Sequence, residues 1–150
     1  DAPTTNEGMS MRPVLELKQD RLRDVLYGVY NGGTKPGMRS VRSGDWKLLK
    51  YDGMNGTVRR TQLFNLATNP EELLVEHGEE AVRAMTGYRP ATIQRDLSDD
   101  PRYAEVRAKM EGLLLAEMQR LDDPWRLWDQ PDDGLTPPAD APPRPAKAKQ

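Results

Sequence analysis

One stretch of the sequence gathers cations beside aromatic rings, a combination that could bind an anionic ligand. Residues 37–56 read GMRSVRSGDWKLLKYDGMNG, and they contain Arg39, Arg42, Lys47, Lys50, Trp46 and Tyr51. The same pattern also fits a β-hairpin with one solvated face. Side chains alternate along a strand, so Lys50 shares a side with Leu48 while Lys47 shares the other with Leu49. Neither side is purely basic, which weakens a nucleic-acid interpretation.

Lys35 lies just before this stretch, in the glycine-rich loop NGGTKPG. A cation on such a loop is often solvated, but loops on a rigid scaffold are also where proteins place ligand-binding groups. Both interpretations of Lys35 stay open on the residues alone.

The other polar candidates have structural explanations. His77 is the only histidine, and no nucleophile or acid partner for it is evident in the sequence. Acidic pairs occur at 99–100, 122–123 and 132–133, without EF-hand or HExxH spacing. We therefore interpret the acidic pairs as helix-boundary residues and predict no metal site and no catalytic residue in this chain.

Composition excludes several classes of function. The 150 residues carry a formal net charge of -2, which gives no overall attraction to nucleic acid or to an anionic membrane. No apolar run approaches the length of a membrane span. The chain has no cysteine, which excludes disulfides, a cysteine nucleophile and thiolate metal sites within these residues. We predict neither nucleic acid nor membrane as a partner.

Four short segments have strand character. They lie at about 25–30, 38–42, 46–51 and 61–66, and short connections join the last three. Ser-Gly-Asp separates the second from the third, with Gly44 available for a positive φ. Because these connections leave no room for crossover helices, we predict an antiparallel meander.

Helical patterns flank this sheet. We expect a short helix at about 10–17, with Ser10 as N-cap and Pro13 in its first turn. A second helix is predicted to start at Asn69-Pro70, with Glu72 at the third helical position. EEAVRAM, within the ambiguous region 77–98, has a helical pattern.

The strongest helix begins at Pro101, with Ser98 or Asp99 as its cap, and Pro124 ends it. Its apolar stripe consists of Tyr103, Val106, Met110, Leu113, Leu114, Met118 and Leu121. Trp125 and Trp128 follow, and we expect them to dock the end of this helix. A long helix and a small sheet can bury each other's apolar faces, so the predicted fold class is α+β, with a sheet of about four strands.

Segment composition sets the domain limits. Residues 1–8 form a flexible start, and residues 131–150 form a Pro- and Ala-rich tail without enough apolar surface to fold. Residues 9–130 form one domain. Because Asp1 is not an initiator methionine, we expect a piece of a longer protein.

Four segments in order resemble the C-terminal region of the formylglycine-dependent sulfatases, of the alkaline-phosphatase-like superfamily. EGMSMRPVL is similar to Gly-x-Ser-Leu-x-Pro-Leu-Leu, and RSVRSGDWKLLKY to Arg-x-Val-Arg followed by aromatic-Lys-Leu-Ile. TQLFNLATNPEE is similar to Glu-Leu-Tyr-Asp-Leu-x-x-Asp-Pro-x-Glu, and a last amphipathic helix ends in LDDP. The resemblance covers about residues 7–128. Phe64, Asn65 and Asn69 depart from the family pattern, and 77–98 is an insertion.

The resemblance implies a small antiparallel sheet flanked by the long C-terminal helix, within an exported (periplasmic or extracellular) enzyme that hydrolyses sulfate esters. It also implies that the parent enzyme uses calcium and a formylglycine made from Cys-x-Pro-x-Arg. This chain contains no cysteine and none of the family's metal-binding motifs. We therefore expect the C-terminal subdomain of a sulfatase, inactive alone, with the N-terminal catalytic domain and a sulfated carbohydrate as partners.

The resemblance also gives Lys35 a role, since a lysine in this loop reaches substrate in some similar sulfatases. The subdomain would then pack on the catalytic domain and line one side of the substrate pocket. One alternative is a free-standing module that binds sulfated or acidic glycans on the basic hairpin. A second alternative is a protein-interaction domain that uses the last helix and its tryptophans.

Overall fold

A computed structural model describes residues 8–32, 36–87, 89 and 95–131. Its strands are β1 (Val25–Tyr30), β2 (Gly37–Ser43), β3 (Trp46–Gly53) and β4 (Val58–Asn65). Its helices are α1 (Arg12–Leu15), α2 (Glu80–Thr86) and α3 (Ala104–Arg120), with 3-10 turns η1 (Met54–Gly56), η2 (Val75–Gly78) and η3 (Pro101–Tyr103). The predicted α+β class is confirmed, whereas most of the predicted flexible start and tail lies outside these residues.

The four strands form one antiparallel sheet in the order β1-β2-β3-β4. β2 and β3 meet through Gly44-Asp45, with Ser43 opposite Trp46. Gly44 has a φ of 57°, the positive value that a tight hairpin turn requires. The predicted meander and its glycine turn are therefore confirmed.

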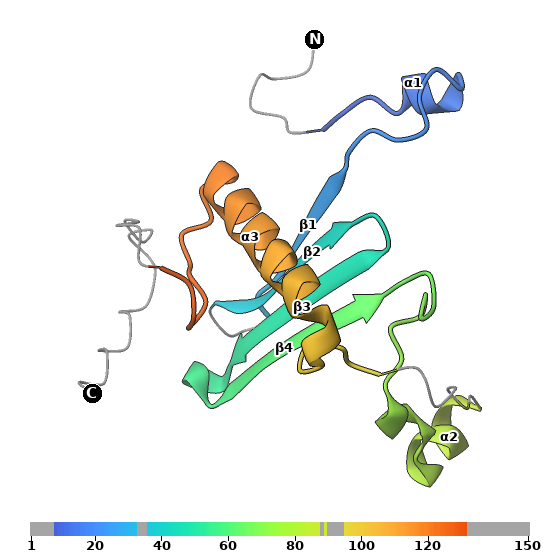
Figure 1. Cartoon of the computed structure of the whole chain (residues 1–150), viewed down its shortest axis with the longest axis vertical. Helices are drawn as coiled ribbons and strands as arrows, with labels where there is room; N and C mark the ends of the chain where they lie inside the picture. The colour runs from blue at the N-terminus through green and yellow to red at the C-terminus, as the bar shows by residue number, and fades with distance from the viewer. Residues whose placement is uncertain (1–7, 33–35, 88, 90–94, 132–150) are drawn as a thin grey trace.

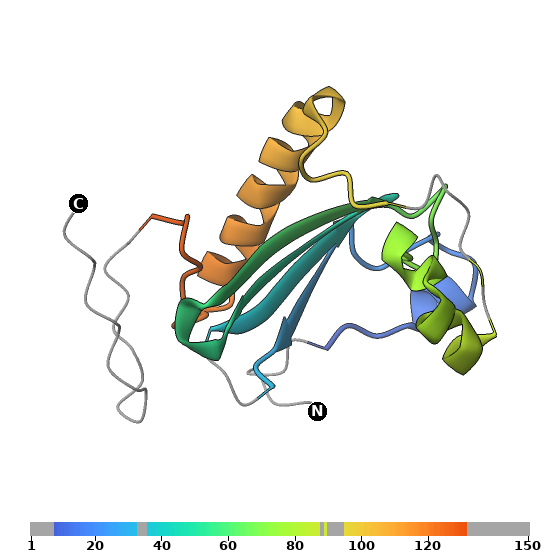
Figure 2. The same cartoon turned by 90° about the horizontal axis from the view of Figure 1, so that it is seen from below.

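α3 lies across one face of this sheet, and α1 and α2 both lie beyond the end of the sheet where β1 begins and β4 ends (Figures 1 and 2). The core between α3 and the sheet consists of Val41, Leu48, Leu63, Met110, Leu114, Met118 and Leu127. A smaller core on the opposite face consists of Leu49, Phe64 and Leu74. The predicted alternation in β3 is confirmed, because Leu48 and Leu49 belong to different cores.

Three predicted helix starts need correction. The helix expected at 10–17 has only four residues, and its N-cap is Met11; the Ser10 hydroxyl still accepts the Arg12 N–H at 3.3 Å. α3 is preceded by η3, and the cap is Asp100 rather than Ser98 or Asp99, because its carboxylate accepts the Arg102 N–H.

The third correction concerns the helix expected from Asn69, which does not form. Both ends of the Asn69 amide bind the backbone of Leu73, at 2.8 and 2.9 Å, and close a loop instead. Glu72 has a φ of 55°, which a continuous helix does not allow. The short polar side chain of Asn69 can bind nearby backbone groups in place of helical hydrogen bonds, and it does so here.

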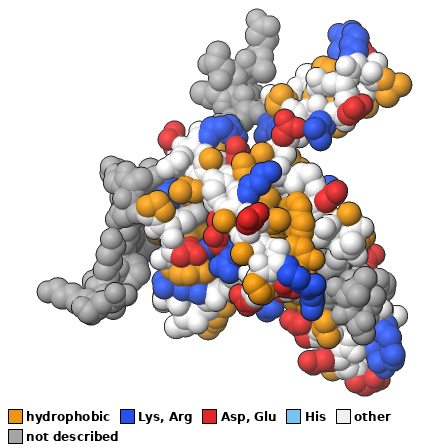
Figure 3. All heavy atoms as spheres, in the orientation of Figure 1, with side chains coloured by type: hydrophobic (Ala, Val, Ile, Leu, Met, Phe, Trp, Pro, Cys, Tyr) orange, Lys and Arg blue, Asp and Glu red, His pale blue; other side chains and the backbone are white. Residues whose placement is uncertain are grey.

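No helix in the described part of the chain is long and apolar enough to cross a membrane. The side of the molecule that carries α3 shows Lys and Arg interspersed with Asp and Glu, without a single basic field (Figure 3).

Candidate functional site

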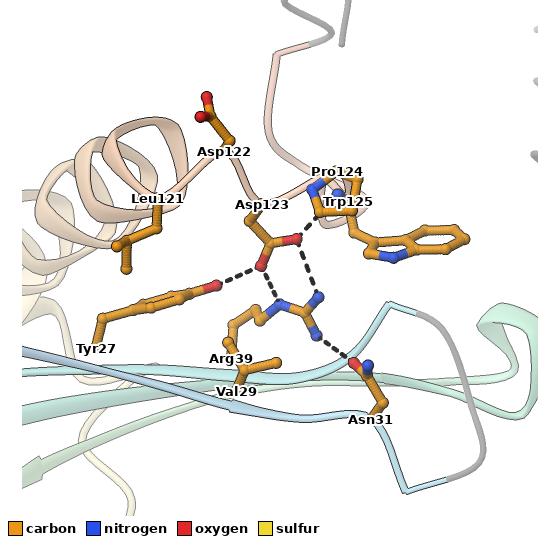
Figure 4. Close-up of a pocket in the computed structure, with 9 residues that line it drawn as sticks. All are labelled: Tyr27, Val29, Asn31, Arg39, Leu121, Asp122, Asp123, Pro124 and Trp125. Carbon is orange, nitrogen blue, oxygen red and sulfur yellow. Dashed lines mark hydrogen bonds and ion pairs between the residues drawn. The ribbon is translucent and has the colours of Figure 1, made fainter. Parts of the chain in front are cut away.

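A buried ion pair fastens the segment after α3 to the sheet. Arg39 of β2 is 1% exposed, and its Nε and Nη2 donate to the two carboxylate oxygens of Asp123 at 2.7 and 3.1 Å. The Tyr27 hydroxyl of β1 also donates to Asp123, and so does the Trp125 N–H, at 2.9 Å (Figure 4). The third Arg39 nitrogen donates to Asn31 at 3.0 Å and to the Pro36 carbonyl.

The protonation states of this cluster follow from its contacts. Burial opposes ionisation of Asp123, but donation from Arg39, Tyr27 and the Trp125 N–H outweighs it, so the pKa of Asp123 is lowered. Burial, followed by the bond to ionised Asp123, raises the pKa of the Tyr27 hydroxyl. Every Arg39 nitrogen has an acceptor within the protein, and the side chain is 1% exposed, so we interpret Arg39 as a residue that holds the fold together.

A pocket of about 390 Å³ lies over this cluster, between β1 and the segment that follows α3. Its lining consists of Tyr27, Val29, Asn31, Arg39, Leu121, Asp122, Asp123, Pro124 and Trp125 (Figure 4). Val29 is 50% exposed and Asn31 is also exposed, so the pocket opens at the outer strand of the sheet. The ion pair forms its floor, and apolar side chains form much of its wall.

Lys50 of β3 forms a second buried cation, directly opposite Arg39 in the sheet register. Its Nζ contacts the carboxylates of Asp129 and Glu111, the latter at 3.3 Å, and lies 4.8 Å from the centroid of the Trp128 ring. The adjacent positive charges of Arg39 and Lys50 would repel each other if unpaired. Each is paired with a separate carboxylate from the segment after α3, Asp123 for Arg39 and Asp129 for Lys50. The expected docking role of Trp128 is confirmed, since it packs on the main core.

On the opposite face, Lys47 pairs with Glu72 through both carboxylate oxygens, at 2.6 and 2.7 Å. Among the four cations of residues 37–56, only Arg42 has no ion pair within the described part of the chain. The hairpin therefore does not present the free basic face that the glycan-module alternative needs. What looked like a binding surface in the sequence consists mainly of internal ion pairs.

The two other candidates have separate outcomes. His77 accepts the Leu74 N–H at Nδ1 (2.9 Å), so its ring closes the η2 turn. Lys35, the one predicted substrate-binding residue, lies outside the residues that the structure describes. Its role stays a prediction, although both flanks of its loop, Asn31 and Pro36, contact the Arg39 guanidinium.

The sequence does not predict the pocket or the buried role of Asp123, whose place before Pro124 indicates a helix-boundary residue. One signal was present. Arg39 and Val41 fall on the same side of β2, so the Arg39 guanidinium is expected in the core beside an apolar residue. Such a charge requires a buried partner, although the pattern does not say which carboxylate supplies it.

Known proteins share this fold and part of this sequence. The chain matches no protein-family model. An uncharacterized protein of Haemophilus influenzae is 28% identical over 127 residues, which are 84% of this chain and 52% of that relative. The structure of BT4656 in complex with its substrate D-glucosamine-2-N,6-O-disulfate has a similar fold, with a TM-score of 0.56 and 16% identity.

That likeness covers 82% of this chain but 22% of the solved one. The chain therefore spans about half the length of its curated relative and about a fifth of the length of its structural neighbour. At this level of identity the likeness establishes the fold alone, which is matched by about a fifth of a longer protein.

Proposed function

We propose that this chain is the C-terminal subdomain of a sulfatase, a sulfate ester hydrolase, and that it packs on a larger catalytic domain. One observation carries the proposal. The fold of 82% of this chain matches about a fifth of a protein whose substrate is a disulfated glucosamine, and about residues 7–128 of the sequence resemble the sulfatases. A fold alone does not define a function, whereas a matching fold together with matching motif order supports one.

The positions of the motif residues support the proposal. Arg39, in the Arg-x-Val-Arg segment, binds Asp123 of the LDDP segment. Lys47, in the aromatic-Lys-Leu segment, binds Glu72 of the NPEE segment. Segments that are separate in the sequence are thus joined in pairs by ion pairs. In this proposal the shared motifs preserve a scaffold, and the chemistry belongs to the catalytic domain.

The calcium ion and the formylglycine of such an enzyme do not fit this chain's own residues. Formylglycine needs a cysteine, and the sequence has none. No group of three or more His, Asp or Glu side chains able to hold a metal occurs among the described residues. We assign both groups to the catalytic domain and derive no step through either, and we place the whole enzyme outside the cytoplasm.

Within this proposal the subdomain contributes to one side of the substrate pocket through the loop that carries Lys35. The ammonium group would bind a sulfate or another anionic group of a sulfated carbohydrate. Arg39 would act indirectly, since it holds both flanks of that loop at Asn31 and Pro36.

The test uses the whole protein and measures sulfate release from D-glucosamine-2-N,6-O-disulfate and related sulfated sugars. We expect hydrolysis by the whole protein and none by this chain alone. A Cys-x-Pro-x-Arg motif in the coding sequence ahead of Asp1 is required. Its absence, or a whole protein that releases no sulfate from any sulfated sugar, would refute the proposal.

Lys35 is tested in the same assay. Lys35→Ala should raise KM or lower kcat for a sulfated sugar, whereas Lys109→Ala, which removes an exposed lysine of α3, should leave both unchanged. Kinetics equal to those of the wild type for Lys35→Ala would remove the substrate role while leaving the sulfatase proposal intact.

A further inference from the structure

The backbone of β1 has one unpaired side. Ser43 and Trp46 close a two-residue hairpin, which makes them a hydrogen-bonded pair. Hydrogen-bonded pairs recur at every second residue, so the odd-numbered residues of β2 bind β3 and the even-numbered ones bind β1. Their partners in β1 are Leu26, Gly28 and Tyr30. Val25, Tyr27 and Val29 therefore point their N–H and C=O groups away from the sheet. No backbone hydrogen bond from these three residues to a described residue outside the strand occurs.

The other edge of the sheet is partly covered, along the second half of β4. By the same count, Thr61 and Leu63 of β4 face outward, and three of their four backbone groups have partners there. The Leu63 N–H donates to the Asp96 carboxylate at 3.0 Å, and the Leu63 C=O accepts the Leu97 N–H at 2.9 Å. The Thr61 C=O accepts the Ser98 hydroxyl at 3.0 Å. These outward groups of β4 are thus protected, whereas those of β1 are open, an arrangement that favours pairing with another strand at β1.

The side chains at the open edge are apolar and exposed. Leu26 is 54% exposed, Val29 50% and Tyr30 64%. Leu26 and Tyr30 lie on the sheet face opposite α3, and Val29 lies on the α3 face beside the 390 Å³ pocket. A strand added to β1 would cover both sets, because its own side chains alternate between the same two faces. Those on the α3 face would lie beside Leu121, Pro124 and Trp125 of the pocket wall.

We propose that β1 is the docking edge for an extended strand supplied by the larger domain of the same protein, which becomes the fifth strand of this sheet. The proposal rests on the proposed function, since that domain supplies the strand. The larger domain is our choice of partner because the matched proteins are much longer than this chain. About half of the curated relative and about four-fifths of the structural neighbour lie outside the matched region and could supply the strand. Main-chain hydrogen bonds give such a contact its affinity, and the flanking pockets give it specificity.

The first test compares amide hydrogen exchange in this chain alone and in the whole protein. Tyr27 and Val29 should exchange rapidly in the isolated chain, whereas Leu26 and Gly28, bound to β2, should be protected. In the whole protein the Tyr27 and Val29 amides should slow by about 100-fold or more, because their opening then requires separation of two domains. Equal exchange at Tyr27 and Val29 in both forms overturns the proposal, whatever the enzyme's activity.

The second test measures binding of the separately expressed larger domain to this chain. Val29→Pro removes an outward N–H, which an edge strand tolerates, while Val29→Thr keeps the N–H and the branched shape. Loss of one buried hydrogen bond should weaken Kd by about tenfold for Val29→Pro and by less than about threefold for Val29→Thr. Circular dichroism must show that both variants are folded. Equal affinities for the two variants overturn the proposal.

Two other occupants give different results and also overturn it. A second copy would produce concentration-dependent dimers of this chain alone, which Leu26→Lys would abolish. The chain's own tail would protect the Tyr27 and Val29 amides in the isolated chain, and deletion of residues 132–150 would remove that protection. If the whole protein has sulfatase activity but its Tyr27 and Val29 amides are not protected, only the docked strand is refuted. If these amides are protected but the whole protein has no sulfatase activity, only the proposed sulfatase function is refuted.

Discussion

Replacement of Asp123 by alanine should be among the most destabilising substitutions in this chain. The carboxylate accepts two hydrogen bonds from Arg39, one from Tyr27 and one from the Trp125 N–H. Its removal leaves the Arg39 guanidinium 1% exposed and without a counter-ion. Breaking one half of a buried pair costs about 3–5 kcal/mol of the free energy of unfolding, mostly because a buried charge is left uncompensated.

This loss is a large part of the 5–15 kcal/mol that holds a typical domain together. For a domain of this size it corresponds to a fall in Tm of about 10–20 °C. The measurement is urea and thermal unfolding, followed by tryptophan fluorescence, because Trp125 and Trp128 lie in the affected segment. Asp24→Ala is the matched control: its carboxylate pairs with Arg21 at 2.8 Å but is exposed, so its loss should cost less than about 0.5 kcal/mol.

Two further variants keep the prediction testable if Asp123→Ala does not fold. Tyr27→Phe removes one donor and should cost about 1–2 kcal/mol. The double variant Arg39→Met with Asp123→Leu removes both charges and should be more stable than Asp123→Ala alone. A loss below about 1 kcal/mol for Asp123→Ala, or a double variant no more stable than the single one, would refute the view that a buried charge pair fastens the segment after α3.

Three further predictions concern acid, backbone and core. Because the pKa of Asp123 is lowered on folding, its stabilisation is complete above about pH 4 and is lost below it; the difference in stability between wild type and Asp123→Asn should therefore shrink in acid. In urea unfolding, Gly44→Ala should lower the free energy of unfolding by about 1 kcal/mol, because its φ is positive. Gly37→Ala should lower it by about 2 kcal/mol or more, because its φ is also positive and a Cβ there would lie 2.6 Å from the Tyr30 carbonyl oxygen. Leu114→Ala, at a fully buried site, should cost about 2–5 kcal/mol, against less than about 0.5 kcal/mol for the exposed Met85→Ala.

The sheet and the last helix could be predicted because their signals are local. Alternation places Leu48 and Leu49 on opposite faces, and Gly44 marks the turn between β2 and β3. The stripe through Met110, Leu114 and Met118 gives the buried side of α3. Each of these patterns depends on residues close in the sequence, so no knowledge of distant partners is required.

The helix predicted from Asn69 failed for a local reason that the pattern could not weigh. Asn-Pro-Glu-Glu satisfies the rules for a helix start, yet the Asn69 side chain binds Leu73 at both its N–H and its C=O. Glu72 then turns into the left-handed region and reaches Lys47, 25 residues earlier. A loop that ends in an ion pair with the sheet competes with a helix of similar local propensity, and the tertiary contact decides between them.

The basic hairpin shows why charge in a sequence is a weak guide to a binding surface. Arg39 and Asp123 are 84 residues apart, so nothing near Arg39 in the sequence reveals that its charge is already neutralised. Burial in β2 places the guanidinium on the side of Val41, where desolvation makes a carboxylate partner obligatory. Free capacity for a ligand must therefore be sought where donors remain unpaired. Within the described residues the outward N–H and C=O groups of β1 meet that condition, and the hairpin cations largely do not.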